Sequence, residues 1–185
     1  MNRREALQKT ALALGYAVSA PALAGLMQGC KPSADSKTVF LNDTQATLLG
    51  EVTEIIIPRT DTPGAKEAGV PAFIDQMLRE VYPKKDQDRF LEGLTALDDE
   101  ARKVYGNPFV NCEKKHQVLM VKKSHDEALA ANAPDQPFIL MAKELTLLGF
   151  FTSEPGATQV LQYNQSPGPY HGCVPLAEVG KAWAT

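Results

Sequence analysis

Residues 42–57 read NDTQATLLGEVTEIII, and Pro58 follows them directly. The large aliphatic side chains of this stretch recur at helical spacing and form one apolar stripe, made by Leu48, Leu49, Val52, Ile55 and Ile56. Asn42 and Gln45 have the three-residue spacing of a capping box, and a proline cannot continue a helix interior. The stretch therefore predicts an amphipathic helix that begins after Asn42, ends before Pro58 and packs one face against a core.

Helices separated by proline- and glycine-rich loops are expected along the rest of the chain. Residues 58–69, PRTDTPGAKEAG, predict a loop built around a Pro63-Gly64 turn. Apolar positions at helical spacing then predict helices over 70–81, 84–105, 111–131 and 138–151, the last being the most apolar and the most buried. Apolar positions of the two middle helices are Phe90, Leu94, Leu97, Ala101 and Val104, then Val118, Leu119, Ala128 and Leu129. No segment alternates apolar and polar residues for long, so the sequence predicts an all-α domain of about five helices.

The C-terminal quarter has a different composition. Seven of the 25 residues from 151 to 175 are glycine or proline. We expect a short turn near residues 157–161 and then an irregular, turn-rich tail. Because such a segment buries little of its own surface, it is expected to lie against the helical domain or against another molecule.

The first 29 residues have the layout of an export signal. Arg3, Arg4 and Lys9 precede an uncharged stretch of alanine, leucine and glycine over residues 11–29. The adjacent Arg3 and Arg4 resemble a twin-arginine signal, and an ordinary secretory signal that holds two arginines is the alternative. A permanent membrane anchor is the weaker interpretation, because the stretch is rich in alanine and glycine and leads into a polar segment.

Residues 26–30, LMQGC, resemble a bacterial lipobox and predict lipidation of Cys30. Cleavage after Ala24 is the alternative.

The chain then divides into an export signal over 1–29, a flexible linker over 30–41 and a helical domain over 42–185. Removing the signal takes three basic residues and one acidic residue from a chain of 185 residues with net charge −3, which leaves 156 residues with net charge −5. We expect a periplasmic, membrane-associated protein.

The overall composition excludes several classes of protein. Hydrophobic residues make up 44% of the chain and charged residues 22%, which is too apolar for a disordered protein. The net charge of −3 lacks the basic surplus of a nucleic-acid binder. Three cysteines are too few for a disulfide scaffold.

The sequence contains no recognisable catalytic, cofactor-binding or metal-binding residues. His116 and His125 are nine residues apart on one predicted helix, which places them on opposite faces and prevents them from sharing a metal. His171 and Cys173 have no further ligands at suitable spacing. Motifs for covalent haem attachment, for dinucleotide binding and for a hydrolase nucleophile do not occur. The acidic residues 98–100 are interpreted as a solvated helix face. An enzyme that uses His171 and Cys173 as a reactive pair is the remaining catalytic alternative.

Cys112 and Cys173 remain after export, and an even number of cysteines in an oxidising compartment is typical of a disulfide. We therefore hypothesise a bridge that fixes the irregular tail to the start of the helix near residue 111. Two free thiols are the alternative.

Two stretches, residues 47–78 and 143–175, resemble the gluconate 2-dehydrogenase small subunit (subunit 3) family. The first contains I-I-P-x-T-D-T-P-G followed by A-G-V-P-x-F-I-D. The second contains L-G-F-F-T-S-E-P-G, then a tyrosine and P-G-x-Y-x-G-C. The resemblance covers about 140 residues, and its middle, over 80–135, matches mainly in helix pattern.

The resemblance implies a non-catalytic subunit of a flavin-dependent sugar or polyol dehydrogenase of the glucose-methanol-choline type. FAD would be bound by the large subunit, and haem c by a third, cytochrome c subunit. In that family the small subunit carries the twin-arginine signal, and the large flavoprotein is exported with it. The alternative is a stand-alone envelope lipoprotein that acts as a binding or scaffold module.

The resemblance also marks individual positions, many of which need only turn geometry. They are Pro58, Thr60, Pro63, Gly64, Gly69 and Pro71 in the first stretch, and Gly149, Phe150, Thr152, Ser153, Gly156, Tyr163, Pro167, Gly168, Gly172 and Cys173 in the second. Aromatic rings in an irregular segment are typical of interfaces, although they can equally cover the core. The expected partner contacts are Phe150, Phe151, Thr152, Ser153, Tyr163, Tyr170 and Trp183.

Overall fold

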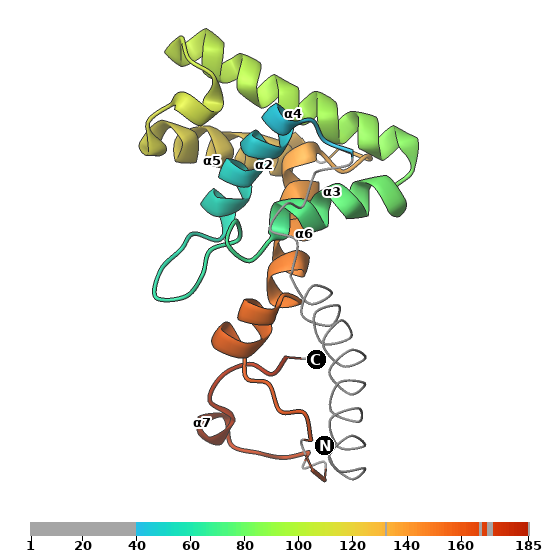
Figure 1. Ribbon diagram of the computed structural model, residues 1–185, viewed down its shortest axis with the longest axis vertical. Coiled ribbons are helices and arrows are strands. Elements are labelled where there is room, and N and C mark those ends of the chain that lie inside the picture. Colours follow the sequence, from blue (N-terminus) through green and yellow to red (C-terminus); the bar gives the residue numbers. More distant parts are fainter. Residues whose placement is uncertain (1–39, 132, 167, 170–171, 185) are drawn as a thin grey trace, which may run out of the picture. The chain divides into compact units, whose positions relative to one another are not determined.

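The computed structural model describes residues 40–131, 133–166, 168–169 and 172–184, which are coloured in Figure 1. The chain divides into two units, residues 1–36 and 37–185, and every described residue belongs to the second unit. The predictions for the export signal, its cleavage and its lipidation fall on residues outside the described ranges. The same holds for the predictions made for Arg3, Arg4, Cys30, Tyr170 and His171.

The described residues form helices and loops, which confirms the all-α prediction (Figure 1). The long helices are α2 (Asp43–Ile56), α3 (Val70–Glu80), α4 (Lys84–Tyr105), α5 (Lys114–Ala131) and α6 (Phe138–Phe151). The short elements are the 3-10 turn η1 (Phe109–Asn111), the π-helical turn η2 (Gly156–Val160) and α7 (Leu176–Val179). Within the described ranges, β structure amounts to one isolated bridge between Gln162 and Trp183.

Helix α2 begins and ends where its sequence indicates. The Asn42 side chain accepts a hydrogen bond from the Gln45 backbone N–H at 2.9 Å, and the Gln45 side chain accepts one from the Asn42 N–H at 3.0 Å. This reciprocal pair is the predicted capping box. Asp75 on α3 is 3% exposed and accepts a hydrogen bond from the Leu41 N–H at 2.6 Å, so the chain entering α2 is fixed to α3.

Helix α6 is the centre of the helical core, as expected for the most apolar segment. It packs against α2, α3, α4 and α5, and 8 of its 14 residues are buried. Two glycines allow the close approach. A Cβ on Gly149 would lie 2.5 Å from the Phe73 ring of α3, and a Cβ on Gly93 of α4 would lie 2.2 Å from the Phe138 side chain. Phe138 also meets Phe90 edge to face, with the ring centroids 4.9 Å apart.

The apolar positions expected on the two middle helices are partly wrong. Val104 is 60% exposed, Val118 42%, Leu119 58% and Leu129 57%. On α5 the expected positions are spread over about half of the helix circumference, which is wider than the face that packs on the core. The buried positions of α5 are Gln117, Met120, Val121 and Ala128. Helix α5 also begins three residues later than expected, because residues 109–111 form η1.

Candidate functional site

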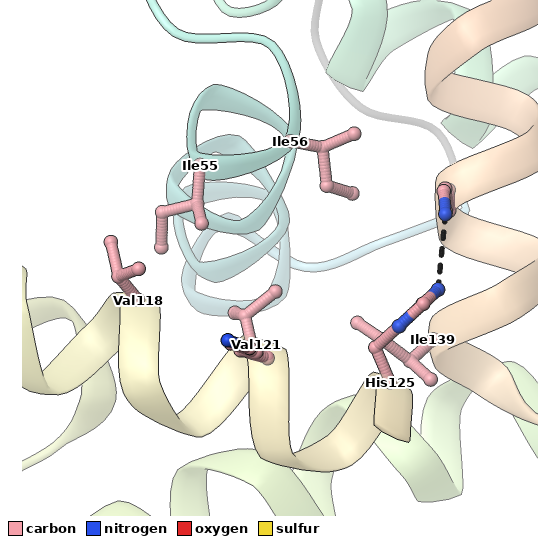
Figure 2. Close-up of a pocket in the computed structure, with 8 residues that line it drawn as sticks. Ile55, Ile56, Val118, Val121, His125 and Ile139 are labelled. Atoms are coloured by element: carbon pink, nitrogen blue, oxygen red, sulfur yellow. Dashed lines mark hydrogen bonds between the residues drawn. The ribbon is translucent and has the colours of Figure 1, made fainter. Parts of the chain in front are cut away.

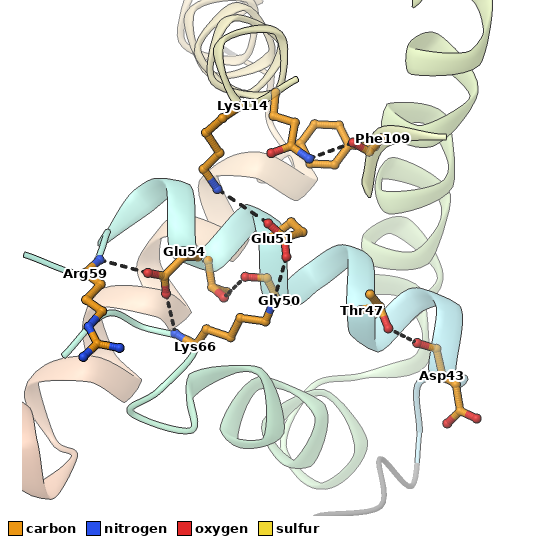
Figure 3. A network of polar contacts seen from close by, with 11 residues as sticks. Asp43, Thr47, Gly50, Glu51, Glu54, Arg59, Lys66, Phe109 and Lys114 are labelled. Carbon is orange, nitrogen blue, oxygen red and sulfur yellow. Dashed lines mark hydrogen bonds and ion pairs between the residues drawn. The ribbon is translucent and has the colours of Figure 1, made fainter. Parts of the chain in front are cut away.

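The loop between α2 and α3 is held in place by two glutamates of α2 (Figure 3). The Glu54 carboxylate accepts hydrogen bonds from the backbone N–H of Arg59 at 2.9 Å and of Lys66 at 3.0 Å. Gly64 lies so close to this carboxylate that a Cβ would stand 2.3 Å from Glu54 Oε1 and 2.7 Å from the Arg59 nitrogen. The predicted Pro63-Gly64 turn is therefore packed directly on the α2 side chain that organises the loop.

Glu51 connects this loop to a second helix. Its carboxylate accepts a hydrogen bond from Lys66 Nζ at 2.6 Å and lies 3.5 Å from Lys114 Nζ at the start of α5 (Figure 3). The hydrogen bond from Lys66, with the charge of Lys114 added, holds the pKa of the Glu51 carboxyl below its usual value. Residues 59–61 form the exposed tip of the loop. Below the tip, the contacts of Glu51 and Glu54 with Lys66 and Lys114 form the loop base, which is fixed to both α2 and α5.

A cavity of about 270 Å³ opens between α2, α5 and α6 (Figure 2). Its lining is aliphatic apart from three nitrogen-bearing side chains. The lining residues are Ile55, Ile56, Val118, Val121, Lys122, His125, Ile139 and Lys143. Lys143 Nζ on α6 lies 3.0 Å from His125 Nε2 on α5. The other ring nitrogen of His125, Nδ1, lies 3.4 Å from Asp126 Oδ1.

A third exposed feature is the apolar surface at the end of α6 and in the segment after it. Leu147 is 39% exposed, Leu148 46% and Phe151 39%. Further along the chain, Tyr163 is 61% exposed and Trp183 52%. The backbone beside Trp183 is fixed, because the Gln162 N–H donates to the Ala182 carbonyl and the Ala184 N–H donates to the Gln162 carbonyl, each at 2.9 Å.

The structure separates the described residues among the predicted partner contacts into three groups. Phe150 is only 2% exposed, so the prediction that its side chain contacts a partner is wrong: the ring fills the core between helices. Thr152 and Ser153 terminate α6, since their hydroxyls donate to the carbonyls of Leu148 at 2.7 Å and Phe150 at 2.6 Å. Phe151, Tyr163 and Trp183 expose their rings, and their contact with a partner stays a prediction.

Cys112 and Cys173 are free thiols in the structure, and their disulfide stays a hypothesis. Cys112 is half-buried with its Sγ 3.5 Å from the Pro108 carbonyl oxygen, and burial raises the pKa of its thiol, with the Asp98 charge adding to the effect. Cys173 is exposed.

The charged clusters and histidines also have structural partners. The interpretation of residues 98–100 as purely solvated is wrong for Asp98, which accepts a hydrogen bond from the Phe109 N–H at 2.7 Å and pairs with Arg102 at 2.8 Å. His116 stacks on Tyr105 with the ring centroids 4.3 Å apart, whereas His125 meets Lys143.

Among the described residues, no three histidine, cysteine or carboxylate side chains converge as a metal site would require. None of the helices in the described ranges has the length and apolarity to cross a membrane.

Sequence reasoning did not identify the polar residues of the cavity or of the loop base. A signal for the cavity exists, because Val118, Lys122 and His125 recur at helical spacing on α5. Glu51 and Glu54 have no comparable signal. Their roles depend on where the loop returns to α2, which no local pattern determines.

Comparison with known proteins gives a family match. A family model described as gluconate 2-dehydrogenase subunit 3 matches residues 43–168, which contain the five long helices, the loop of Figure 3, the cavity and η2. The comparison with curated proteins and the comparison with solved structures returned no match.

Proposed function

Because the chain belongs to the gluconate 2-dehydrogenase subunit 3 family, we propose that it is the non-catalytic small subunit of a periplasmic, FAD-dependent dehydrogenase complex of the gluconate type. The substrate class is a sugar or polyol. The large flavoprotein subunit binds FAD and oxidises the substrate, and a cytochrome c subunit with haem c receives the electrons. This chain supports the maturation, the export and the stability of the flavoprotein.

The observation that carries the proposed function is the family match across residues 43–168. It includes the whole helical core and the loop that Glu51 and Glu54 hold in place. The exposed apolar side chains at the end of α6 support it further, since large aromatic and aliphatic groups are common at the centre of subunit interfaces.

The proposed export route starts from the N-terminal sequence. The adjacent Arg3 and Arg4 resemble a twin-arginine signal, which directs proteins that fold before transport. We propose that the chain folds in the cytoplasm, binds the flavoprotein and accompanies it across the membrane. Cys30 then anchors the chain through a lipid on the periplasmic side.

The experiment for this route replaces Arg3 and Arg4 by lysine in the native host. The flavoprotein should then accumulate in the cytoplasm together with the variant chain, while the wild-type pair is found in the periplasmic or membrane fraction. A flavoprotein that reaches the periplasm in normal amounts without this signal would overturn the export role. Mass spectrometry of the mature N-terminus tests the lipid: an unmodified residue that follows Ala24 would overturn lipidation of Cys30.

Co-purification tests membership of the complex itself. A tagged chain should bring down a yellow, FAD-containing protein with sugar or polyol dehydrogenase activity. A tagged chain that is recovered alone from the envelope would instead favour a stand-alone lipoprotein.

A further inference from the structure

The C-terminal segment over residues 172–184, which includes α7, is closed back on Gln162 (Figure 1). The backbone of Gln162 is hydrogen-bonded to the chain on both sides of Trp183, at 2.9 Å in each case. The Gln162 side-chain amide also donates to the carbonyls of Val179 and Lys181. One residue therefore fixes the point to which the segment returns. We call residues 172–184 the C-terminal arm.

The base of the C-terminal arm is joined to the end of α6. Lys181 Nζ donates a hydrogen bond to the Gln159 carbonyl at 3.0 Å, and Gln159 lies in η2, which packs against α6. Gly180 has a φ of +70°, which side chains other than glycine rarely adopt, and it turns the chain back after α7. The arm is therefore tied to the same end of α6 that exposes Leu148 and Phe151.

The C-terminal arm exposes large apolar side chains that do not serve the core of this chain. Leu176 is 85% exposed, Trp183 52% and Val174 45%, and Tyr163 next to the base is 61% exposed. None of the described residues after Val160 belongs to the helical core or packs against it. Ordering such side chains without burying them costs conformational entropy and gains no hydrophobic stabilisation. The arrangement is therefore suited to burial against another molecule.

We propose that the C-terminal arm is a preorganised docking element for the catalytic flavoprotein subunit, with Leu176 and Trp183 as the anchors that enter apolar pockets on its surface. Tryptophan is among the residues that contribute most to binding energy at interfaces. Gln162 is a positioning residue, because it holds the arm closed before binding and so lowers the entropy cost of association. The assignment rests on the proposed function, since the partner is the large subunit.

The chemistry of the arm favours a protein surface over a lipid membrane. Its charged residues are Glu178 and Lys181, so its net charge is zero and it offers no basic patch to anionic headgroups. Its backbone is irregular outside α7, and the polar groups of irregular backbone are not satisfied in hydrocarbon. A protein surface supplies hydrogen-bonding partners for these groups together with apolar pockets.

The size of the arm also fits a subunit interface. Each partner brings about 20–30 residues to an interface of standard size, and residues 172–184 are roughly half of that number. The exposed side chains at the end of α6, to which the arm is tied, supply further contacts. The arm and this end of α6 therefore form one side of the same interface.

Burial of the arm can be measured directly, because Trp183 is the only tryptophan in the sequence. The full chain labelled with fluorotryptophan has one fluorine NMR resonance, whose shift depends on light or heavy water while the ring is exposed. Unlabelled, purified flavoprotein should move this resonance and remove most of that dependence. Vesicles of phosphatidylethanolamine and phosphatidylglycerol should leave both unchanged. A ring that stays exposed in the complex, or one that only vesicles bury, would overturn the proposal.

Substitution of the anchors tests their contribution to affinity. Leu176→Ser/Trp183→Ser should raise the Kd of the full chain for the flavoprotein by about tenfold or more. The matched control is Val104→Ser/Leu119→Ser, which changes two exposed aliphatic residues on α4 and α5 and should alter the Kd by no more than about twofold. The thermal midpoint of the arm variant should stay close to that of the wild type. Equal Kd values for the two variants would overturn the anchors.

Gln162→Glu tests the positioning role. It keeps the size of the side chain but replaces the donor amide by a carboxylate, which the carbonyls of Val179 and Lys181 repel. The Kd should rise about fivefold, and the fluorine resonance of the free chain should move toward that of unfolded peptide. Gln159→Glu makes the same change at an exposed side chain and should do neither. Without the anchors, Gln162→Glu should have no further effect on the Kd, whereas full additivity would overturn the positioning role.

Photocrosslinking identifies the occupant. A photoreactive residue at position 176 should crosslink to the flavoprotein in the intact complex, whereas one at position 119 on α5 should not. A crosslink from position 176 to a second copy of this chain, or equal crosslinking from both positions, would overturn the assignment.

The outcomes separate the two proposals. A wild-type chain that binds the flavoprotein while its arm stays exposed to solvent overturns only the assignment of the arm. A wild-type chain that never binds the flavoprotein overturns the proposed function, and the assignment of the arm falls with it.

Discussion

Gly64 is packed directly on Glu54: a Cβ at position 64 would stand 2.3 Å from Glu54 Oε1. The same carboxylate accepts the backbone hydrogen bonds of Arg59 and Lys66, so the loop has no free space on this side. The requirement for glycine here comes from close approach and not from a positive φ, since Gly64 is not among the glycines with positive φ.

Replacing Gly64 by alanine should therefore lower the free energy of unfolding by about 1–3 kcal/mol, because the added methyl displaces the carboxylate or the loop backbone. Gly50→Ala on α2 is the matched control. Its Cβ would meet only the Lys66 side chain at 3.5 Å, and alanine in a helix interior gains about 0.5–1 kcal/mol over glycine. Urea unfolding monitored by circular dichroism measures both changes, and equal stabilities of the two variants would contradict the packing described.

Glu51 makes the stability of the loop base depend on pH. Its pKa is lowered in the folded protein by the hydrogen bond from Lys66, so the stabilisation is present above the unfolded-state pKa near 4.5 and is lost as pH falls through the folded-state pKa. Glu51→Gln should cost about 0.5–1 kcal/mol at pH 7, and this cost should shrink as the pH falls below 4.5 and through the lowered pKa of the folded protein. Thermal unfolding of both proteins across this range measures the difference, and a cost that is independent of pH would contradict an ionic role.

The exposed side chains at the end of α6 should contribute to binding of the flavoprotein and not to folding. Leu148→Asp/Phe151→Asp should raise the Kd for the flavoprotein by about tenfold or more while the thermal midpoint stays close to that of the wild type. The control is Val104→Asp/Leu119→Asp, which changes two aliphatic residues on α4 and α5 that are more exposed than Leu148 and Phe151. Equal weakening by both pairs would mean that α6 has no special role in the interface.

Cys112 and Cys173 should be oxidised to a disulfide in protein isolated from the periplasm. Thiol titration of the unfolded, unreduced protein should then find no reactive thiol from this pair. In the chain-entropy model, a closed loop of roughly 60 residues stabilises the fold by about 4 kcal/mol. Two reactive thiols per chain would refute the bridge and agree with the free thiols of the structure.

The helices could be predicted from sequence because their signals are local. The capping box of Asn42 and the stop at Pro58 are contained within α2, and both are found in the structure. The core face of α5 was identified only at Ala128, because its buried positions also include Gln117, whose amide donates to the Phe109 carbonyl at 2.8 Å. A polar side chain that is buried to satisfy a distant backbone group leaves no apolar periodicity to follow.

The candidate sites were less predictable, because they depend on contacts between residues that are far apart in the sequence. Phe150 and Phe151 are adjacent aromatic residues at the end of one helix, yet one is buried and the other exposed. Only the packing of α6 among four other helices decides which ring faces solvent. Lys122 and Lys143 likewise become neighbours of one cavity only once α5 and α6 are packed together.

Membership of a flavoprotein complex is tested most directly by the flavin content of the isolated chain. The chain, tagged at its C-terminus and purified from the envelope of the native host, should elute as a complex heavier than the 20.1 kDa of its full sequence, with FAD present in a fixed ratio to the chain. Gluconate or another sugar or polyol should reduce that flavin. Recovery of the chain alone, without flavin and without an associated dehydrogenase, would contradict its assignment as a dehydrogenase subunit.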